Sequence, residues 1–370
     1  MKAEAAAPRE TAGLRRPPSP GAGDVGRLVL ALDLGASRVR AAAVAADGSL
    51  LARHQLATPV TEGPEAVLGA CVEALRAARE ELERSAPALA GGLAAIGVAA
   101  PGPLDPWRGV VVDPPNLGPT FREIPLGERI EAALGLPAYV ERDTNVAALA
   151  EGAFGAARAA RDYLYLTVST GLGGAIVSEG HLVLGPDGTA GELGHLPVEL
   201  DGPPCGCGGR GHLEAIASGV AVARAARRAV ERGESPELER LAAEHGLGGL
   251  DARRVAEAET AGDPAATAIM ARARHAFAAV CVGLVDVFNP ELIVVGGSLA
   301  RAQGERWLAP ARESVARHAF RIPARRARIV PAALGDDVGL VGATVLVRQR
   351  AADDRWRGGR PPIHAAISAA

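Results

Sequence analysis

Apolar runs separated by short polar turns predict three consecutive strands over residues 28–56. LVLALD is apolar up to its final aspartate, RVRAAAVA follows a polar turn, and SLLARHQL follows Asp47-Gly48. An Asp-Gly pair between two strand-like segments is typical of a β-hairpin. We therefore expect an antiparallel meander at the start of the folded chain.

Helical and strand patterns then alternate. In residues 62–84, apolar side chains recur at the spacing of a helix that buries one face. LAAIGVAA is short and continuously apolar, as a buried strand is. The expected elements up to the middle of the chain are a helix over 62–84, a strand over 93–100, a helix over 125–134, a strand over 137–140 and a helix from Asp143 to Ala150.

A strand, a glycine turn and a second strand occur at residues 28–44 and again at 163–178. This weak internal duplication, with helices and strands alternating after each unit, predicts two α/β domains that face a cleft. The elements expected after the second unit are a largely helical stretch over 213–288, a buried strand over 291–297, a helix over 303–318, a strand over 327–332 and a helix over 336–348.

The boundary between the two domains is expected near residues 141–143. Residues 27–142 then form the first domain and 143–335 the second, and the helix over 336–348 packs back on the first. Residues 1–26 and 351–370 have the Pro, Ala and Gly content of disordered segments.

Composition excludes several classes of partner. A net charge of −3 gives no general attraction to nucleic acid or to an anionic membrane. With 3% aromatic residues, there are few platforms on which bases could stack. The apolar runs are shorter than the roughly 18 residues of a membrane span, and residues 1–26 lack the apolar centre of a signal peptide. Four cysteines do not make a disulfide framework, so we expect a cytoplasmic protein.

The segment over residues 189–214 carries the most informative chemistry. Two cysteines and two histidines on this Gly/Pro-rich stretch suit tetrahedral Zn²⁺ in a structural site with four protein ligands. A redox pair is the alternative, although its usual spacing is C-x-x-C and not C-x-C. Two glutamates flank the cluster, where their oxygens can accept hydrogen bonds from a polyhydroxyl ligand. The residues are Glu192, His195, Cys205, Cys207, His212 and Glu214.

Two polar turns at corresponding places in the two halves predict a phosphate site. Backbone N–H groups and hydroxyls in such turns can hold phosphate oxygens, and Asp33 can hold a hydrated Mg²⁺. A Walker-type loop is excluded because Lys2 is the only lysine. Each turn alone also fits an ordinary β-turn. The residues are Asp33, Gly35, Ala36, Ser37 and Arg38 in the first turn, and Ser169, Thr170, Gly171, Gly173 and Gly174 in the second.

Asp143 follows a strand and starts a helix. It fits the N-cap of that helix, and it also fits a general base that accepts the proton of an attacking hydroxyl. The helix N-terminus is expected to favour its ionised form. Gly296 and Gly297 end a strand, where they either let a ligand approach closely or form a simple turn.

Taken together, these motifs resemble the ROK family (repressor, open reading frame, kinase) of the actin-like sugar kinase superfamily. The resemblance extends over roughly residues 27–348 in the correct order, and its most specific part is the block over 188–214. The family's two phosphate turns are similar to 33–38 and 169–174, its P-G-P and P-N-L segments to 101–103 and 115–117, its N-D-A-N-A-A-A-L-G-E helix to 142–151, its A-G-E-x-G-H and C-x-C-G-x-x-G-C-x-E segments to 190–195 and 205–214, and its last two glycine motifs to 291–297 and 335–343.

The resemblance implies two actin-like (ribonuclease H-like) domains, phosphorylation of a hexose or N-acetylhexosamine by ATP with Mg²⁺, and a homodimer or homotetramer. It implies that Asp143 is the catalytic base, that both turns hold the ATP phosphates, and that Gly296 and Gly297 lie by the adenosine. The implied sugar site contains Asn116, Arg142, Asp143, Glu192, His195 and Glu214, and the implied zinc ligands are His195, Cys205, Cys207 and His212.

Four positions depart from the family's pattern. Ala36 replaces a turn glycine and cannot adopt a positive φ cheaply, and Arg38 replaces a lysine. His212 replaces a cysteine, which leaves a normal zinc ligand set. Arg142 replaces a sugar-binding asparagine beside the base. It can face the sugar and alter substrate preference or weaken catalysis, or it can turn away and pair with a carboxylate such as Glu141 or Glu151.

Three functions are compared. We expect an ATP-dependent sugar kinase. A sugar-sensing repressor would carry a winged-helix domain before the first turn, where this sequence has 32 residues of arm-like composition. A sugar-binding protein with little turnover is the alternative that Ala36 and Arg142 leave open, although the retained Asp143 favours an enzyme.

Overall fold

The computed structural model describes residues 28–352, so the expected disordered arm and most of the expected tail lie outside the described residues. The first domain is built on a five-stranded sheet in the order β3-β2-β1-β4-β7. The first three strands form the expected antiparallel meander, and β4 and β7 continue the sheet in parallel. The strands are β1 (Leu28–Leu34), β2 (Arg38–Ala45), β3 (Leu50–Ala57), β4 (Leu93–Ala100) and β7 (Ala138–Arg142).

Strand β1 is apolar at consecutive positions because both faces of its sheet are covered. Leu30 and Leu32 point into a core with α1 (Pro64–Ser85) and α3 (Leu126–Leu134). Val29 and Ala31 point to the opposite face, where they pack with α4 (Asp143–Phe154) and α13 (Val338–Ala352). The last helix therefore lies against the first sheet, and it includes Ala351 and Ala352, which were expected in the tail.

The second sheet repeats the arrangement of the first. Its order is β10-β9-β8-β11-β12, so an antiparallel trio is again followed by two parallel strands. The expected unit over 163–178 and the expected strands over 291–297 and 327–332 are present, although the second strand of the unit begins at Leu172, within the expected glycine turn. The strands are β8 (Tyr163–Val168), β9 (Leu172–Ser178), β10 (His181–Leu182), β11 (Leu292–Gly296) and β12 (Arg328–Pro331). This repetition is the actin-like fold of two α/β domains.

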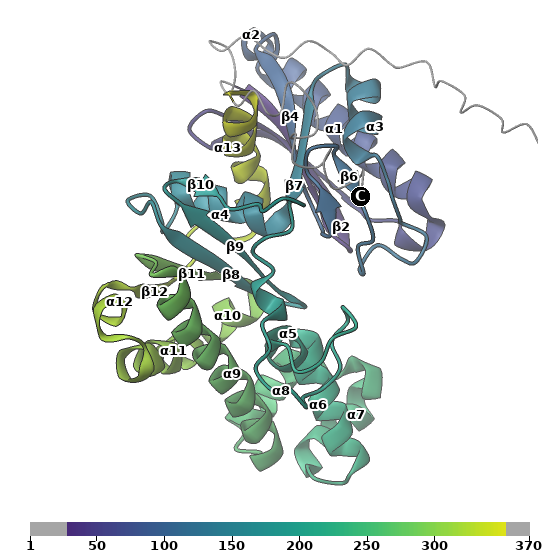
Figure 1. Ribbon diagram of the computed structural model, residues 1–370. Helices are drawn as coiled ribbons and strands as arrows, with labels where there is room; N and C mark the ends of the chain where they lie inside the picture. Colours follow the sequence, from purple (N-terminus) through teal and green to yellow (C-terminus); the bar gives the residue numbers. More distant parts are fainter. Residues whose placement is uncertain (1–27, 353–370) are drawn as a thin grey trace, which may run out of the picture.

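Helices surround the second sheet and extend beyond it (Figure 1). Helix α9 is at their centre, and Phe277 on it contacts Trp307 on α11 with ring centroids 5.6 Å apart. By length and composition alone, α9 could cross a membrane. The sequence analysis did not expect an apolar segment of this length. Half of its most apolar window is buried, so core packing accounts for that composition. The helices are α5 (Leu213–Ala217), α6 (Gly219–Glu231), α7 (Pro236–His245), α8 (Ala252–Thr260), α9 (Pro264–Phe288), α10 (Ser298–Gln303), α11 (Glu305–His318) and α12 (Arg321–Arg326).

A helix that was not expected precedes an expected one after β11. The helix predicted over 303–318 is α11 alone, and α10 precedes it across Gly304, whose φ of +52° ends the earlier helix. The short elements α2 (Pro87–Ala90), β5 (Leu104–Asp105), β6 (Val110–Val111) and α12 were not expected, because they are too short to leave a periodicity in the sequence.

Helix α4 joins the two sheets and lies between them (Figure 1). Val146 and Leu149 pack with α13 in the core of the first domain. Ala147 and Ala148 pack with Tyr163 and other residues of the second sheet. The N-terminus of α4 therefore opens at the junction of the two domains, where the ends of β1, β4, β7 and β8 meet.

Candidate active site and metal centre

Asp143 is the first residue of α4 and follows directly after β7. The N-cap position belongs to Arg142, so the interpretation of Asp143 as an N-cap is wrong. One Asp143 carboxylate oxygen accepts a hydrogen bond from the adjacent Thr144 N–H at 2.7 Å. The Asp143 side chain is exposed, whereas its neighbours Arg142 and Thr144 are buried.

Surrounding protein and negative charge raise the pKa of Asp143 to about 6. The largest cause is loss of hydration between the domains, and the negative charge of Asp33 adds to it. The Thr144 N–H and the positive charge of Arg142 oppose the shift. The expected preference of the helix N-terminus for an ionised carboxylate is therefore outweighed. At neutral pH this carboxylate is ionised and more basic than an ordinary aspartate, which suits a general base.

The first phosphate-type turn lies between β1 and β2. Asp33 is buried at its start and contacts the Arg40 guanidinium, and burial raises the pKa of this carboxyl against the effect of Arg40. The turn is closed by a hydrogen bond from the Gly35 N–H to the Arg38 carbonyl at 3.0 Å. Ala36 is not among the non-glycine residues with positive φ, so its replacement of glycine causes no backbone strain of that kind. Ala36, Ser37 and Arg38 are exposed.

The second expected turn, over residues 169–174, lies only partly between β8 and β9, because β9 already begins at Leu172, and it contacts both α4 and Glu214 on α5. A Cβ atom on Gly173 would lie 2.9 Å from Thr144 Cγ2, and one on Gly171 would lie 2.9 Å from Glu214 Oε1. The Leu172 N–H donates to Glu214 Oε1 at 3.2 Å. Glycine is therefore required for this approach, and the turn couples α4 to α5.

A cavity of about 830 Å³ opens beside the second turn. Ser169 and Thr170 line its edge, and the Ser169 hydroxyl lies 2.7 Å from that of Ser298 at the start of α10. Helices α6, α8, α10 and α11 contribute to the remaining walls, which include Arg227 on α6, Arg253 on α8 and Arg306 on α11. The sequence analysis missed these residues because they lie on three separate helices and share no motif.

Gly296 and Gly297 line a smaller cavity of about 110 Å³, with Glu151 and Tyr165. The larger cavity begins at the next residue, Ser298. The two glycines therefore line the small cavity at the end of β11 and not the large one.

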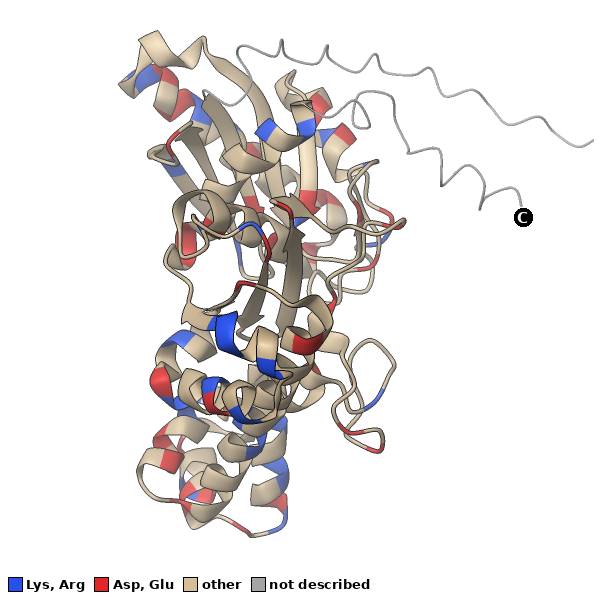
Figure 2. Cartoon of the chain, turned by 60° about the vertical axis from the view of Figure 1, so that its left-hand side comes forward, with Lys and Arg blue, Asp and Glu red and all other residues tan. Residues whose placement is uncertain are grey.

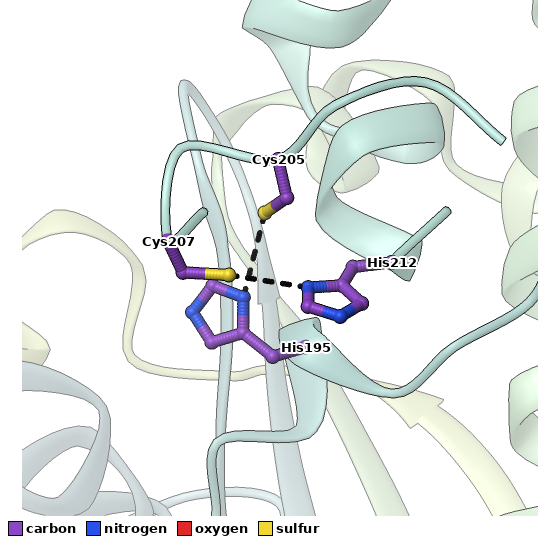
Figure 3. A group of neighbouring side chains, drawn as sticks. All are labelled: His195, Cys205, Cys207 and His212. Carbon is purple, nitrogen blue, oxygen red and sulfur yellow. Dashed lines mark hydrogen bonds between the residues drawn. The ribbon is translucent and has the colours of Figure 1, made fainter. Parts of the chain in front are cut away.

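The four expected zinc ligands converge on one point. The nearest donor atoms of His195, Cys205, Cys207 and His212 all lie within 4.8 Å of one another (Figure 3). Cys205 Sγ lies 3.6 Å from His195 Nδ1, and Cys207 Sγ lies 3.2 Å from His212 Nδ1. Ligand atoms about 2.0–2.3 Å from a tetrahedral zinc are separated by somewhat less than 4 Å, so this donor set fits Zn²⁺ after a small contraction.

His195 faces the other candidate metal ligands on one side and Glu192 on the other. Its Nδ1 points to Cys205, and its Nε2 lies 3.9 Å from Glu192 Oε2. Zinc on Nδ1 would leave the proton on Nε2, which could then donate towards Glu192 or a ligand beside it. Glu214 lies on the metal side, with Oε2 3.6 Å from Cys205 Sγ and 3.9 Å from His195 Nδ1.

Arg142 faces Glu192 and does not turn away to Glu141 or Glu151. Its Nη1 lies 2.5 Å from Glu192 Oε1, and its side chain is 3% exposed. The side chain of Glu141 pairs with Arg350 instead. The carboxylate of Glu151 accepts from the backbone N–H groups of residues 156, 333 and 334.

Asn116 is exposed in the loop between β6 and α3. Among the described residues, no hydrogen bond joins it to Glu192, His195 or Glu214. Its place in a sugar site therefore stays a prediction.

The geometry can be compared with known proteins. The model of the ROK family matches residues 29–350. The chain is 33% identical to a glucokinase of Thermotoga maritima over 322 residues, which covers 87% of this chain and 98% of that protein. It is 33% identical to an N-acetylmannosamine kinase of Citrobacter koseri, with 86% and 98% covered.

A ROK family glucokinase from Streptomyces griseus, solved in complex with glucose and AMPPNP, has a similar structure. The TM-score is 0.72 and the identity is 33%, with 87% of this chain and 99% of that chain covered. The matches extend over nearly the whole length of these relatives. The chain therefore belongs to the ROK family and is an enzyme of its sugar-kinase class.

Proposed function

We propose that the protein transfers the γ-phosphoryl group of ATP to a hydroxyl of a hexose or an N-acetylhexosamine. The observation that carries this proposal is the position of Asp143. Its exposed, unusually basic carboxylate lies at the junction of the two domains, near Asp33 of one phosphate-type turn and Glu192 beside the metal loop. A base for a sugar hydroxyl has to stand between a phosphate site and a hydroxyl-binding site.

The sugar would bind against Glu192, His195 and Glu214, whose oxygens and ring nitrogen are suited to hydroxyl groups. Asp143 would orient the attacking hydroxyl and accept its proton as the phosphoryl group transfers. A structural zinc on His195, Cys205, Cys207 and His212 would hold the loop, and through it the His195 ring, in place.

The nucleotide would occupy the 830 Å³ cavity, with its phosphates directed past Ser169 and Thr170 towards the first turn. Backbone N–H groups and hydroxyls of both turns would bind the phosphate oxygens. Mg²⁺ held near Asp33 would neutralise charge on the phosphates during transfer. The ATP assignment is supported by the AMPPNP bound to the Streptomyces griseus relative.

The test is a coupled assay of ADP release over hexoses and N-acetylhexosamines, with the purified full-length chain, ATP and Mg²⁺. Glucose, mannose, N-acetylglucosamine and N-acetylmannosamine form the core of the panel. We expect turnover with at least one sugar and none without sugar. Sugar binding by calorimetry with no turnover on any sugar would instead support a sugar-binding protein, the alternative that the Arg142–Glu192 ion pair favours.

A further inference from the structure

The described chain passes between the two domains twice. The first connection, over residues 155–162, leads from the end of α4 to β8, and the second, over 332–337, leads from β12 to α13. The whole second domain separates these segments in the sequence, yet one side chain contacts both of them. It is Glu151, which lies on the last turn of α4 and is 0% exposed.

The Glu151 carboxylate accepts hydrogen bonds from both connections. Its Oε2 accepts from the Ala156 N–H at 2.7 Å, and its Oε1 accepts from the N–H groups of Ala333 and Leu334, each at 2.9 Å. Among the described residues it forms no ion pair, so backbone N–H groups alone solvate its charge. Displacing such a carboxylate is costly, because each of these buried donors would lose a charged acceptor. The two connections are therefore fastened to one point.

The backbone after α4 is shaped to this carboxylate. A Cβ atom on Gly155, which follows the helix, would lie 2.1 Å from Glu151 Oε2. The Glu151 carbonyl also accepts from the N–H groups of Gly155 and Ala157, at 3.1 and 3.0 Å. The main chain and the side chain of one residue thus hold the first connection, and only glycine leaves room for both.

The second connection is attached to both phosphate-type turns through arginines. Arg40, which pairs with Asp33 at the first turn, donates to the Asp336 carbonyl at 2.6 Å. Arg301 on α10 donates to Asp336 Oδ1 at 2.8 Å, and α10 borders the second turn and the large cavity. A shift of the segment that Glu151 holds would therefore move the two turns relative to each other.

We propose that Glu151 is a positioning residue for phosphoryl transfer, which fixes both connections and so sets the distance between the two phosphate-type turns. The nucleoside would contact the second domain alone, whereas the triphosphate needs both turns. Asp143 begins the helix on which Glu151 lies, so the base and the fastening point share one rigid element. This inference rests on the proposed function and adds a residue that contacts neither the sugar nor the phosphates.

Glu151→Gln is the informative variant, because an amide can satisfy only one connection. If its oxygen accepts from Ala333 and Leu334, its NH₂ group faces the Ala156 N–H, and two donors then oppose each other. Asp263→Ala is the matched control. Asp263 is also a buried carboxylate, held by an N–H and a hydroxyl, but both of these lie within the second domain. Loss of this helix cap should lower the melting temperature without displacing either connection.

Binding and turnover are measured on the full-length chain with Mg²⁺. In Glu151→Gln, calorimetry should give a Kd for AMPPNP raised by about tenfold or more, because a ligand that spans two sites depends on their spacing. The Kd for adenosine should match wild type. With the sugar that wild type uses best, kcat should fall by about tenfold or more, since a misplacement of about 1 Å can cost 10²-fold.

Hydrogen exchange locates the cause of these changes. The amides of Ala156, Ala333 and Leu334 should exchange faster in Glu151→Gln than in wild type or in Asp263→Ala. The control should lose thermal stability and keep the wild-type kcat and AMPPNP Kd.

A Glu151→Gln protein whose kcat and AMPPNP Kd both equal those of wild type would overturn the positioning role. Equal losses in Asp263→Ala would also overturn it, because the effect would then follow stability alone. If wild type turns over no sugar, the proposed function fails, and the comparison of AMPPNP with adenosine still decides the role of Glu151.

Discussion

At the scale of single residues, Asp143 shows how a surface-accessible group acquires unusual chemistry. Its carboxylate is exposed, yet the two domains and the charge of Asp33 raise its pKa to about 6. Folding therefore disfavours its ionised form. A charge that is unfavourable in the folded protein is a common property of catalytic groups.

Asp143→Asn should remove phosphoryl transfer and leave sugar binding largely intact. The amide keeps the size of the side chain but cannot accept the proton, so kcat should fall by at least roughly 10²-fold. Because the raised pKa means that the charge does not stabilise the fold, the melting temperature should stay equal or rise. Coupled ADP release, calorimetry and thermal unfolding measure the three quantities. Wild-type turnover in the variant would show that the base lies elsewhere.

The ionisation of Asp143 should also determine how kcat/KM depends on pH. Only the carboxylate accepts a proton, so the rate should be constant above the pKa and fall as pH drops through about 6, tenfold per pH unit. An ordinary aspartate would place that fall near pH 4. The charges of Asp33, Arg142 and Glu192, which lie on adjoining segments, contribute to the pKa of Asp143 and so to the pH at which the rate falls. A fall in kcat/KM near pH 4 would contradict the raised pKa.

At the scale of elements, the candidate metal loop over residues 195–212 brings its four donor side chains together within a short stretch of chain. The four donors lie within 18 residues of one another, and burial raises the pKa of the metal-free Cys205 thiol to about 11. A zinc ion at this cluster would have to displace that proton to bind the thiolate, so we expect loop order and metal binding to be coupled.

Metal analysis of the purified protein should find about one zinc per chain, and the double variant Cys205→Ser with Cys207→Ser should lose it. Removing zinc should also raise the sugar KM, because His195 and Glu214 lose their support. Cys71→Ser is the control, since Cys71 is buried on α1 away from the loop. Zinc content that does not depend on Cys205 and Cys207 would exclude this site.

The second phosphate turn should tolerate no side chain at Gly173. An added methyl group would push on Thr144, next to the proposed base, and a shift of about 1 Å can cost 10²-fold in rate. Gly173→Ala should therefore lower kcat strongly. Gly69→Ala in α1 should not, because a Cβ atom there meets nothing within 4 Å. Equal activity of the two variants would show that the turn and α4 are not coupled.

At the scale of the whole molecule, the end of the chain is part of the first domain. Helix α13 packs on the face of the first sheet that α4 also covers, and Arg350 on it forms a buried ion pair with Glu141 at the end of β7. Positive and negative side chains are otherwise interspersed over the helices (Figure 2). The Arg350–Glu141 pair differs from ion pairs at the surface, because neither buried partner can be hydrated when the other is removed.

Arg350→Met should destabilise the protein by about 3–5 kcal/mol, since it leaves the Glu141 carboxylate buried without its partner. Arg317→Met should change stability by less than about 0.5 kcal/mol, because Arg317 is 70% exposed and lies 3.7 Å from Glu313. Chemical denaturation of both variants provides the comparison. Similar stabilities would mean that α13 contributes little to the first domain.

The sequence by itself determined most of the longer elements and the candidate metal ligands. The meander, the buried strands and the glycine turns depend on local backbone preferences and on apolar periodicity, which neighbouring residues specify. The cluster of His195, Cys205, Cys207 and His212 was identifiable because its members share one loop, so their proximity needed little from the rest of the fold.

Only the tertiary structure decided the partner of Arg142, the pKa of Asp143 and the walls of the large cavity. Arg142 meets Glu192 across 50 positions of sequence, and the pKa of Asp143 depends on Asp33 from the other end of the first domain. The cavity is lined from α6, α8, α10 and α11. Burial and charge at a site are sums over all residues near in space, and most of those residues are distant in the chain.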